Sequence, residues 1–148
     1  MPRTKFRNNT TEISIRCPKD EAEAIHKGAA LLRTTISSVI EYATLDLVHK
    51  LGIYELEHPP KKPKRPWALL PNRDDGPSDA RITLSVSHFS AHLFKRAAEY
   101  VSIPDHEVAT GTFAVGATLH FLARMKNAPD ADPKLAKLVL PEEYENRK

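Results

Sequence analysis

The stretch TEISIRCPKD, residues 11–20, carries the pattern that decides the fold of this chain. Ile13, Ile15 and Cys17 alternate with polar residues, which is the pattern of a half-buried β-strand, and Pro18 ends the alternation. A single strand cannot satisfy its own backbone N–H and C=O groups. This strand therefore needs a partner strand, either in another chain or further along this one.

The composition is that of a globular protein. Of the 148 residues, 41% are hydrophobic and 28% are charged, which fits one ordinary domain or two very small ones. No apolar run reaches about 18 residues, so we expect no membrane span. The basic start, MPRTKFRNNT, lacks the apolar segment of a secretory signal. The single cysteine, Cys17, excludes an internal disulfide and fits a reducing cytoplasm.

Positive charge is concentrated in two places, although the net charge is only +3. The basic residues of these two clusters are Arg3, Lys5, Arg7 and Arg16, and Lys61, Lys62, Lys64 and Arg65. Such clusters are typical of polyanion binding, and the alternative is that they are solvated surface charge.

The chain contains an internal repeat. Residues 12–50 and 81–119 share little identity, but their apolar positions coincide at an offset of 69 residues. The matched pairs are Ile13 with Ile82, Ile15 with Leu84, Cys17 with Val86, Ile25 with Phe94, Ala29 with Ala98, Leu32 with Val101, and Val39 with Val108. Each copy has the pattern of a short strand, a helix of about a dozen residues, a break and a second helix.

Local signals support both helices of the first copy. Pro18 suits the start of a helix that opens at Lys19 or Asp20, and its apolar stripe is Ile25, Ala29 and Leu32. Thr35 is a suitable N-cap for the second helix, which is expected to bury Val39, Ala43 and Leu47.

The second copy carries weaker signals. Ser87 or Ser90 can cap its first helix, and Asp105 is the expected N-cap of its second helix. The second helix has one apolar face, formed by Val108, Val115, Leu119 and Leu122. Gly111 and Gly116 each cost about 1 kcal/mol relative to alanine in a helix, so we expect them to mark close helix contacts where a side chain would not fit.

A proline-rich segment separates the two copies. Residues 55–80, ELEHPPKKPKRPWALLPNRDDGPSDA, contain six prolines and predict an extended, semi-rigid linker. Its length allows the chain to return, so we expect residues 12–17 to pair antiparallel with residues 81–86.

The two strand–helix–helix segments, ISIRCPKDEAEAIHKGAALLRTTISSVIEYA (13–43) and RITLSVSHFSAHLFKRAAEYV (81–101), resemble the ribbon-helix-helix family of Arc, MetJ and CopG repressors and antitoxins. The resemblance covers roughly residues 11–50 and 80–123 and rests mostly on hydrophobic pattern. It implies a mostly α fold with a two-stranded antiparallel β-ribbon, in which two copies fused in one chain form a tandem pseudo-dimer. A fused pseudo-dimer folds independently of protomer concentration.

This resemblance divides the chain into five parts. They are a basic N-terminal arm (1–10), ribbon-helix-helix copy 1 (11–54), a Pro/Lys-rich linker (55–79), copy 2 (80–126) and a C-terminal tail (127–148). Copies 1 and 2 are expected to form one compact domain.

In this family the outward-facing polar residues of the ribbon contact base edges in the major groove. The resemblance assigns this role to Glu12, Ser14, Arg16, Arg81, Thr83 and Ser85. The expected register sets Ser14 opposite Thr83, Arg16 opposite Arg81 and Glu12 opposite Ser85. The arginine end suits guanine O6 and N7, and the other end suits cytosine N4, so we expect an asymmetric target site. The alternative is that these residues are only the solvated face of the ribbon.

The family also binds backbone phosphates at the N-terminus of the second helix. In copy 1 this role falls to Thr35, Ser37 and Ser38. In copy 2 the carboxylates of Asp105 and Glu107 oppose it, so the resemblance leaves further anchoring to Arg3, Lys5, Arg7, Lys61, Lys62, Lys64 and Arg65. Trp67 either pins the linker to the core or stacks on a base.

Other chemistry has little support. His88 and His92 have helical metal-ligand spacing, but no third ligand accompanies them, so no metal or cofactor is expected. Cys17 lies at a core position. No nucleophile elbow or glycine-rich phosphate loop occurs, so we do not expect an enzyme.

The sequence therefore predicts a sequence-specific protein that binds double-stranded DNA, acts as a transcriptional repressor and is located in the bacterial cytoplasm with the nucleoid. Two alternatives stay open: an antitoxin, and an accessory factor in plasmid or T-DNA-type transfer or partition. Residues 127–148 contain the apolar run Leu135, Leu138, Val139 and Leu140. This tail either docks on a protein partner, such as a toxin or the transfer machinery, or folds back on its own helices. The pseudo-dimer is expected to be monomeric, with further association on DNA left open.

Overall fold

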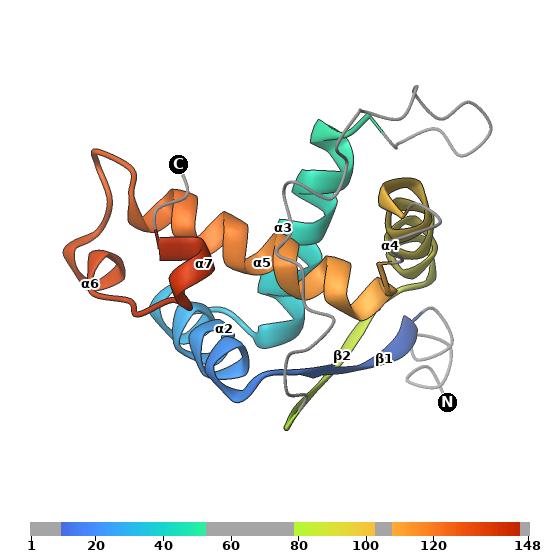
Figure 1. The fold of residues 1–148 in the computed structure, drawn as a ribbon, viewed down its shortest axis with the longest axis horizontal. Helices are drawn as coiled ribbons and strands as arrows, with labels where there is room; N and C mark the ends of the chain where they lie inside the picture. Colours follow the sequence, from blue (N-terminus) through green and yellow to red (C-terminus); the bar gives the residue numbers. More distant parts are fainter. Residues whose placement is uncertain (1–9, 53–78, 103–107, 146–148) are drawn as a thin grey trace, which may run out of the picture.

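The computed structural model of the chain describes residues 10–52, 79–102 and 108–145. Two antiparallel strands, β1 (Thr10–Cys17) and β2 (Ala80–Ser87), form a ribbon (Figure 1). The four long helices are α2 (Lys19–Leu31), α3 (Ile36–Lys50), α4 (His88–Val101) and α5 (Thr110–Lys126). Two short helices follow, α6 (Pro133–Ala136) and α7 (Glu142–Glu145). The prediction of a mostly helical chain with one two-stranded antiparallel ribbon is confirmed.

The register of the ribbon is the predicted one. Ser14 pairs with Thr83, Arg16 with Arg81 and Glu12 with Ser85, so the pairing expected for residues 12–17 and 81–86 is confirmed. The strands are longer than expected, because Thr10 also pairs with Ser87. In this antiparallel pair, the backbone N–H and C=O groups that face the neighbouring strand are hydrogen-bonded. Strand β2 is therefore the partner that the strand pattern of residues 11–17 requires.

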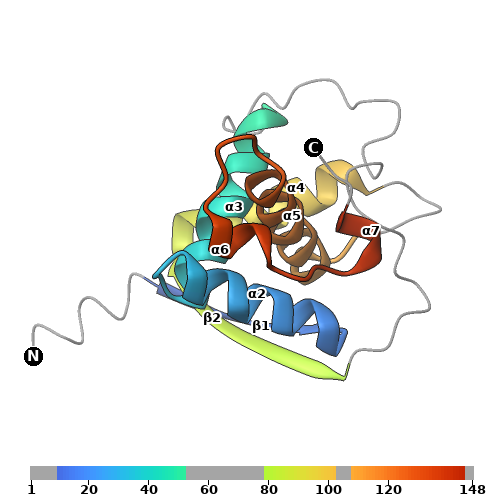
Figure 2. The same cartoon turned by 90° about the vertical axis from the view of Figure 1, so that its left-hand side faces the viewer.

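The ribbon has one covered face and one open face. The apolar positions point into the core, where Ile15, Cys17, Ile82, Leu84 and Val86 are buried and Ile13 is half-buried. The long helices lie on that same side, and the ribbon forms one edge of the molecule in both views (Figures 1 and 2). Because side chains alternate along a strand, the polar residues between these apolar positions point away from the helices.

Local capping explains where three of the long helices begin. Pro18 precedes α2, whose first N–H, that of Lys19, donates to Asp79 Oδ1 at 2.9 Å. Thr35 caps α3 by accepting from Ser38 N, and Ser87 caps α4 by accepting from Ser90 N, as the sequence predicted. The Asp79 contact was not expected, and it ties the start of α2 to the segment that leads into β2.

The start of α5 differs from the prediction. Asp105 was expected to cap this helix, but the N-cap is Ala109 and the helix begins at Thr110. Val108, which the repeat matched with Val39 of α3, lies before α5 and not within it. The connection between the two helices has four residues in the first copy (32–35) and eight in the second (102–109). In this longer connection Ser102 Oγ accepts from Val108 N at 2.8 Å.

The helices of each copy contact the strand of the other copy. Helix α3 packs against β2, α5 packs against β1, and the two helices pack against each other over the ribbon. The expected apolar faces are buried: Val39, Ala43 and Leu47 on α3, and Val108, Val115, Leu119 and Leu122 on and before α5. Of the α2 stripe, Ile25 and Ala29 are buried, whereas Leu32 is half-buried because it forms the C-cap.

Two glycines mark close contacts. A Cβ placed on Gly28 in α2 would lie 2.8 Å from Leu122 Cδ1 of α5. A Cβ on Gly111 would lie 3.1 Å from Ile15 Cγ2, so Gly111 brings α5 close to strand β1. Helix α5 therefore makes the close contact expected at Gly111, and the element that it meets there is strand β1.

The C-terminal tail folds back on its own helices. Leu135, Leu138, Leu140 and Tyr144 are buried in the same core cluster as Ile25 and Leu122. Helix α6 packs against α2 and α5, and α7 packs against α5 (Figure 2). Of the two alternatives for this tail, docking on a partner or folding back on its own helices, the structure shows the second. Of the apolar run, only Val139 is exposed.

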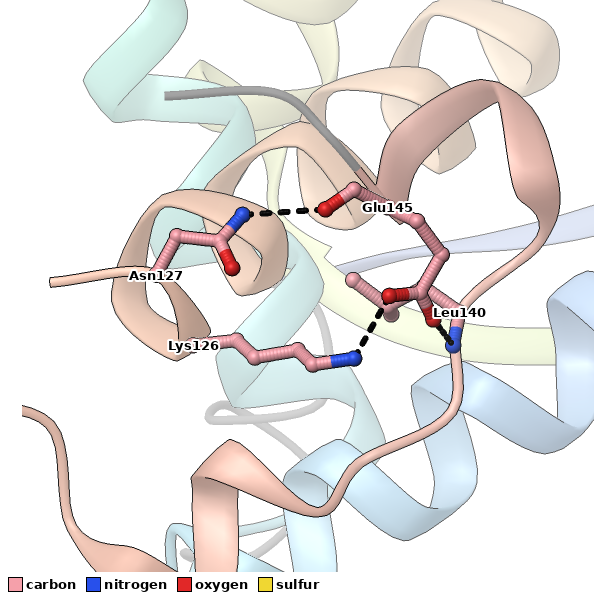
Figure 3. Close-up of polar contacts among 4 residues, drawn as sticks. All are labelled: Lys126, Asn127, Leu140 and Glu145. Atoms are coloured by element: carbon pink, nitrogen blue, oxygen red, sulfur yellow. Dashed lines mark hydrogen bonds and ion pairs between the residues drawn. The ribbon is translucent and has the colours of Figure 1, made fainter.

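A polar clasp holds the end of the tail (Figure 3). The carboxylate of Glu145 accepts from Lys126 Nζ at 2.6 Å and from Leu140 N at 2.7 Å, and Asn127 Nδ2 donates to the Glu145 carbonyl at 3.0 Å. The Lys126 ammonium, and after it the Leu140 N–H, lower the pKa of the Glu145 carboxyl below its ordinary value of 4.5. The clasp therefore depends on an ionised Glu145.

Candidate nucleic-acid interface

The open face of the ribbon presents a set of polar side chains that have no partner among the described residues. Its six members are the predicted base-contacting residues Glu12, Ser14, Arg16, Arg81, Thr83 and Ser85, and all six are exposed. None of these side chains has a hydrogen bond or an ion pair within the described part of the chain. Their donors and acceptors are therefore available to a ligand.

The register brings these side chains close together in pairs. Ser85 donates its backbone N–H to Ser37 Oγ at 3.1 Å, so this N–H points away from β1. The pairs on the open face are therefore the non-hydrogen-bonded pairs of the ladder, in which side chains approach most closely. Ser14 and Thr83 occupy the middle of the face, Arg16 and Arg81 one end, and Glu12 and Ser85 the other.

The arginine end is electrostatically unfavourable in the free protein. Arg16 and Arg81 lie directly opposite each other, and like charges at such positions repel. No carboxylate within the described residues forms an ion pair with either guanidinium. An electron-rich ligand, such as guanine O6 and N7 or a phosphate, would relieve this repulsion.

The N-terminus of α3 lies beside the ribbon, as expected for a phosphate contact. Thr35, Ser37 and Ser38 all lie in this first turn, next to β2. Their hydroxyls are already engaged: Thr35 Oγ1 donates to Ser38 Oγ at 2.8 Å and accepts from Ser38 N, and Ser37 Oγ accepts from Ser85 N. The turn therefore offers mainly backbone N–H groups to an anion, and Ser37 fixes its position against β2.

The matching turn of α5 was missed by the sequence analysis. Because this helix begins at Thr110, its first turn contains Thr110, Gly111 and Thr112 and no acidic residue. Asp105 and Glu107, whose carboxylates were expected to oppose a phosphate contact, both precede the helix and are not part of this first turn. The signal in the sequence was the TGT triplet, which resembles the hydroxyl-rich start of α3.

The remaining predicted anchors are not placed by the structure. Arg3, Lys5, Arg7, Lys61, Lys62, Lys64 and Arg65, and also Trp67, lie outside the described residues.

The two histidines considered as metal ligands lie on the surface. His88 and His92 are exposed, and His88 Nδ1 shares a hydrogen bond with Thr11 Oγ1 at the end of the ribbon. The described residues contain no group of three His, Cys, Asp or Glu side chains that is arranged to hold a metal ion. Cys17 is fully buried in the core, as expected. Within the described ranges, no helix has both the length and the apolarity needed to cross a bilayer.

Comparison of the chain with protein-family models, with curated proteins and with solved structures gives no significant match. The candidate interface is therefore defined by the residues and geometry of this chain alone.

Proposed function

We propose that this protein binds double-stranded DNA, inserts its intramolecular β-ribbon into the major groove and acts as a transcriptional repressor. One observation carries the proposal: six uncommitted polar side chains lie in register on the only ribbon face that the described helices leave open. A two-stranded ribbon has the dimensions to enter the major groove, where each base pair presents a distinct set of donors and acceptors.

The packing supports a tandem ribbon-helix-helix arrangement. In that arrangement the second helix of each copy covers the strand of the other copy, and α3 against β2 with α5 against β1 fits this exchange. The central pair Ser14 and Thr83 lies where a pseudo-twofold axis would cross the ribbon. The arrangement also makes the starts of α3 and α5 equivalent, so that each can contact a phosphate on one side of the groove.

The side chains predict the type of target. Arg16 and Arg81 suit guanine at one end, whereas Glu12 and Ser85 suit the cytosine N4 amino group at the other. The two ends differ, so the preferred site is not palindromic. Each correct bidentate contact discriminates against the wrong base by about 1–3 kcal/mol.

The fold-back of the tail separates this proposal from the antitoxin alternative. A toxin that bound the leucines of the apolar run in this tail would have to extract Leu135, Leu138 and Leu140, which are at most 4% exposed. This burial is consistent with a repressor and adds no support to toxin binding through the tail. Nothing in the described residues favours a transfer or partition factor over a repressor.

Selection of bound fragments from genomic DNA tests the proposal, with wild type compared with Arg16→Ala/Arg81→Ala. We expect wild type to enrich a short, non-palindromic site that contains guanine at one end, and the double variant to lose this enrichment. If the double variant selects the same sites as strongly, the ribbon does not contact the bases and the proposal is wrong.

A further inference from the structure

A hydrogen bond joins the first turn of α3 to one of the proposed base-contacting residues. Ser37, the second residue of α3, accepts at Oγ from the backbone N–H of Ser85 in β2, at 3.1 Å. This N–H lies on the outer edge of the ribbon, where a strand without a neighbour leaves its backbone groups to water. The Ser37 hydroxyl therefore holds the backbone of β2 at the point from which the Ser85 side chain faces the ligand.

The equivalent position at the other end of the ribbon has no side chain. Ser37 lies two residues after the N-cap of α3, and Gly111 lies two residues after the N-cap of α5. Gly111 packs closely on β1, since a Cβ placed on it would lie 3.1 Å from Ile15 Cγ2. Arg16, the repeat counterpart of Ser85, also has its N–H on the outer edge, and no described side chain accepts from it. The two ends of the ribbon are therefore held to their helices in different ways.

This difference matches the two side chains that face the ligand at these positions. The Ser85 hydroxyl is one bond from Cβ, so the backbone of β2 determines where it lies. The Arg16 guanidinium ends a long chain of rotatable bonds and can reach its acceptors from a range of backbone positions. A hydroxyl that accepts from a base N–H needs a donor–acceptor distance of about 2.7–3.2 Å. A firmly placed backbone therefore matters more for base recognition by Ser85 than by Arg16.

We propose that Ser37 is a positioning residue for base recognition, which holds the Ser85 hydroxyl at the distance where it discriminates its base. The inference rests on the proposed function, because it takes Ser85 as a contact to a base edge. Ser37 also belongs to the turn proposed to contact a phosphate, and phosphate contacts set the register of a protein on the duplex. Base recognition at the serine end of the ribbon thus depends on α3, whereas recognition at the arginine end does not.

A set of four variants tests this coupling: Ser37→Ala, Ser85→Ala, the double variant and the conservative Ser37→Thr. Competition in fluorescence anisotropy compares the duplex that wild type selects with duplexes changed at one base pair. Ser85→Ala identifies the base pair that Ser85 contacts, because the preference falls there. We expect Ser37→Ala to lower the preference at that same base pair by about three- to tenfold and to leave the guanine end unchanged. Ser37→Thr keeps the hydroxyl and should retain the preference. The double variant should be no less selective there than Ser85→Ala, because Ser37 acts through Ser85.

The matched control is Thr34→Ala. It removes an exposed hydroxyl just before α3 that has no hydrogen bond among the described residues, so its base preferences should equal those of wild type. Amide hydrogen exchange in the DNA-free protein tests the hydrogen bond itself. The Ser85 N–H should exchange faster in Ser37→Ala than in wild type or in Thr34→Ala.

Four results would overturn the inference. They are an unchanged preference in Ser37→Ala, an equal loss of preference at both ends of the site, a further loss in the double variant beyond that of Ser85→Ala, and unchanged exchange of the Ser85 N–H. Failure of the proposed function would look different, because wild type would then prefer no duplex over another, and the inference would fall with it.

Discussion

Removing the two opposed arginines should stabilise the free protein and weaken its binding to DNA at the same time. The perturbation is Arg16→Gln/Arg81→Gln, which keeps a polar, hydrogen-bonding side chain at each position and removes both charges. Binding sites often retain groups that destabilise the free protein, because those groups are satisfied only by the ligand. The Arg16–Arg81 pair has this character, since the two side chains lie opposite each other and no described carboxylate forms an ion pair with them.

General magnitudes set the expected size of both effects. Two unit charges about 7 Å apart in water repel by about 0.6 kcal/mol, within the range of about 0.2–1 kcal/mol for cross-strand pairs. The repulsion should largely disappear at about 1 M salt, where the screening length is about 3 Å. For DNA, the loss of two bidentate contacts to guanine would cost about 2–6 kcal/mol.

The assay is a double-mutant cycle. Urea unfolding is followed by circular dichroism for wild type, Arg16→Gln, Arg81→Gln and the double variant, at low and high salt. The coupling energy from this cycle measures the interaction between Arg16 and Arg81 separately from the effect of each single glutamine substitution. We expect this interaction to be unfavourable. The matched control is Lys27→Gln/Lys95→Gln, which removes two exposed charges from α2 and α4 and should leave specific DNA binding nearly unchanged.

Two results would refute this reasoning. A coupling energy of zero at low salt would mean that the guanidinium groups do not oppose each other. Equal loss of DNA affinity in the ribbon variant and in the lysine control would mean that the arginines contribute only net charge and no base contact.

Three further changes test the core, the caps and the clasp. Thr44 and Thr118 are both fully buried, but only Thr118 Oγ1 has a hydrogen bond, to Ala114 O at 2.7 Å, and Thr44 Oγ1 has none within the described residues. Thr44→Val should therefore raise the free energy of unfolding by about 1 kcal/mol and Thr118→Val lower it by about the same amount, measured by urea unfolding; the opposite order would contradict the assignment. Thr35→Ala should lower the free energy of unfolding by about 1 kcal/mol through loss of the N-cap, and thermal unfolding unchanged from wild type would contradict this. Because the folded-state pKa of Glu145 is lowered, its contribution to stability is present above pH 4.5 and is lost as pH falls through the folded-state pKa. Glu145→Gln should abolish this part of the acid sensitivity in pH-dependent unfolding curves, and curves of unchanged shape would contradict the clasp.

Much of the fold was predictable because its first copy obeys local rules. The alternation of Ile13, Ile15 and Cys17 determined which face of β1 is buried, and the period of two then fixed the facing pairs. Thr35 and Ser87 cap their helices as their residue types predict. The pairing of two distant strands followed from the internal repeat and not from any local signal.

The errors lie where tertiary contacts outweigh local preference. Asp105 is a better N-cap than Ala109, but the eight-residue connection places the start of α5 at Thr110, where Gly111 fits beside Ile15. A sequence pattern does not reveal this contact, because it joins a helix to the strand of the other copy. The sequence likewise did not decide whether the tail packs inside the molecule or binds a partner, because the same leucines suit an internal core and a partner protein.

The spacing of the two strands has a consequence for synthesis. Residues 18–79 separate β1 from β2, so the ribbon closes late, after a long loop has been made. A chain emerging from the ribosome presents β1 with both edges unpaired until β2 follows, and unpaired edges are sites of aggregation. The charged residues Glu12 and Arg16 within β1 and Pro18 behind it are features that discourage neighbouring chains from pairing there. The residues proposed to contact DNA would then also protect the nascent chain.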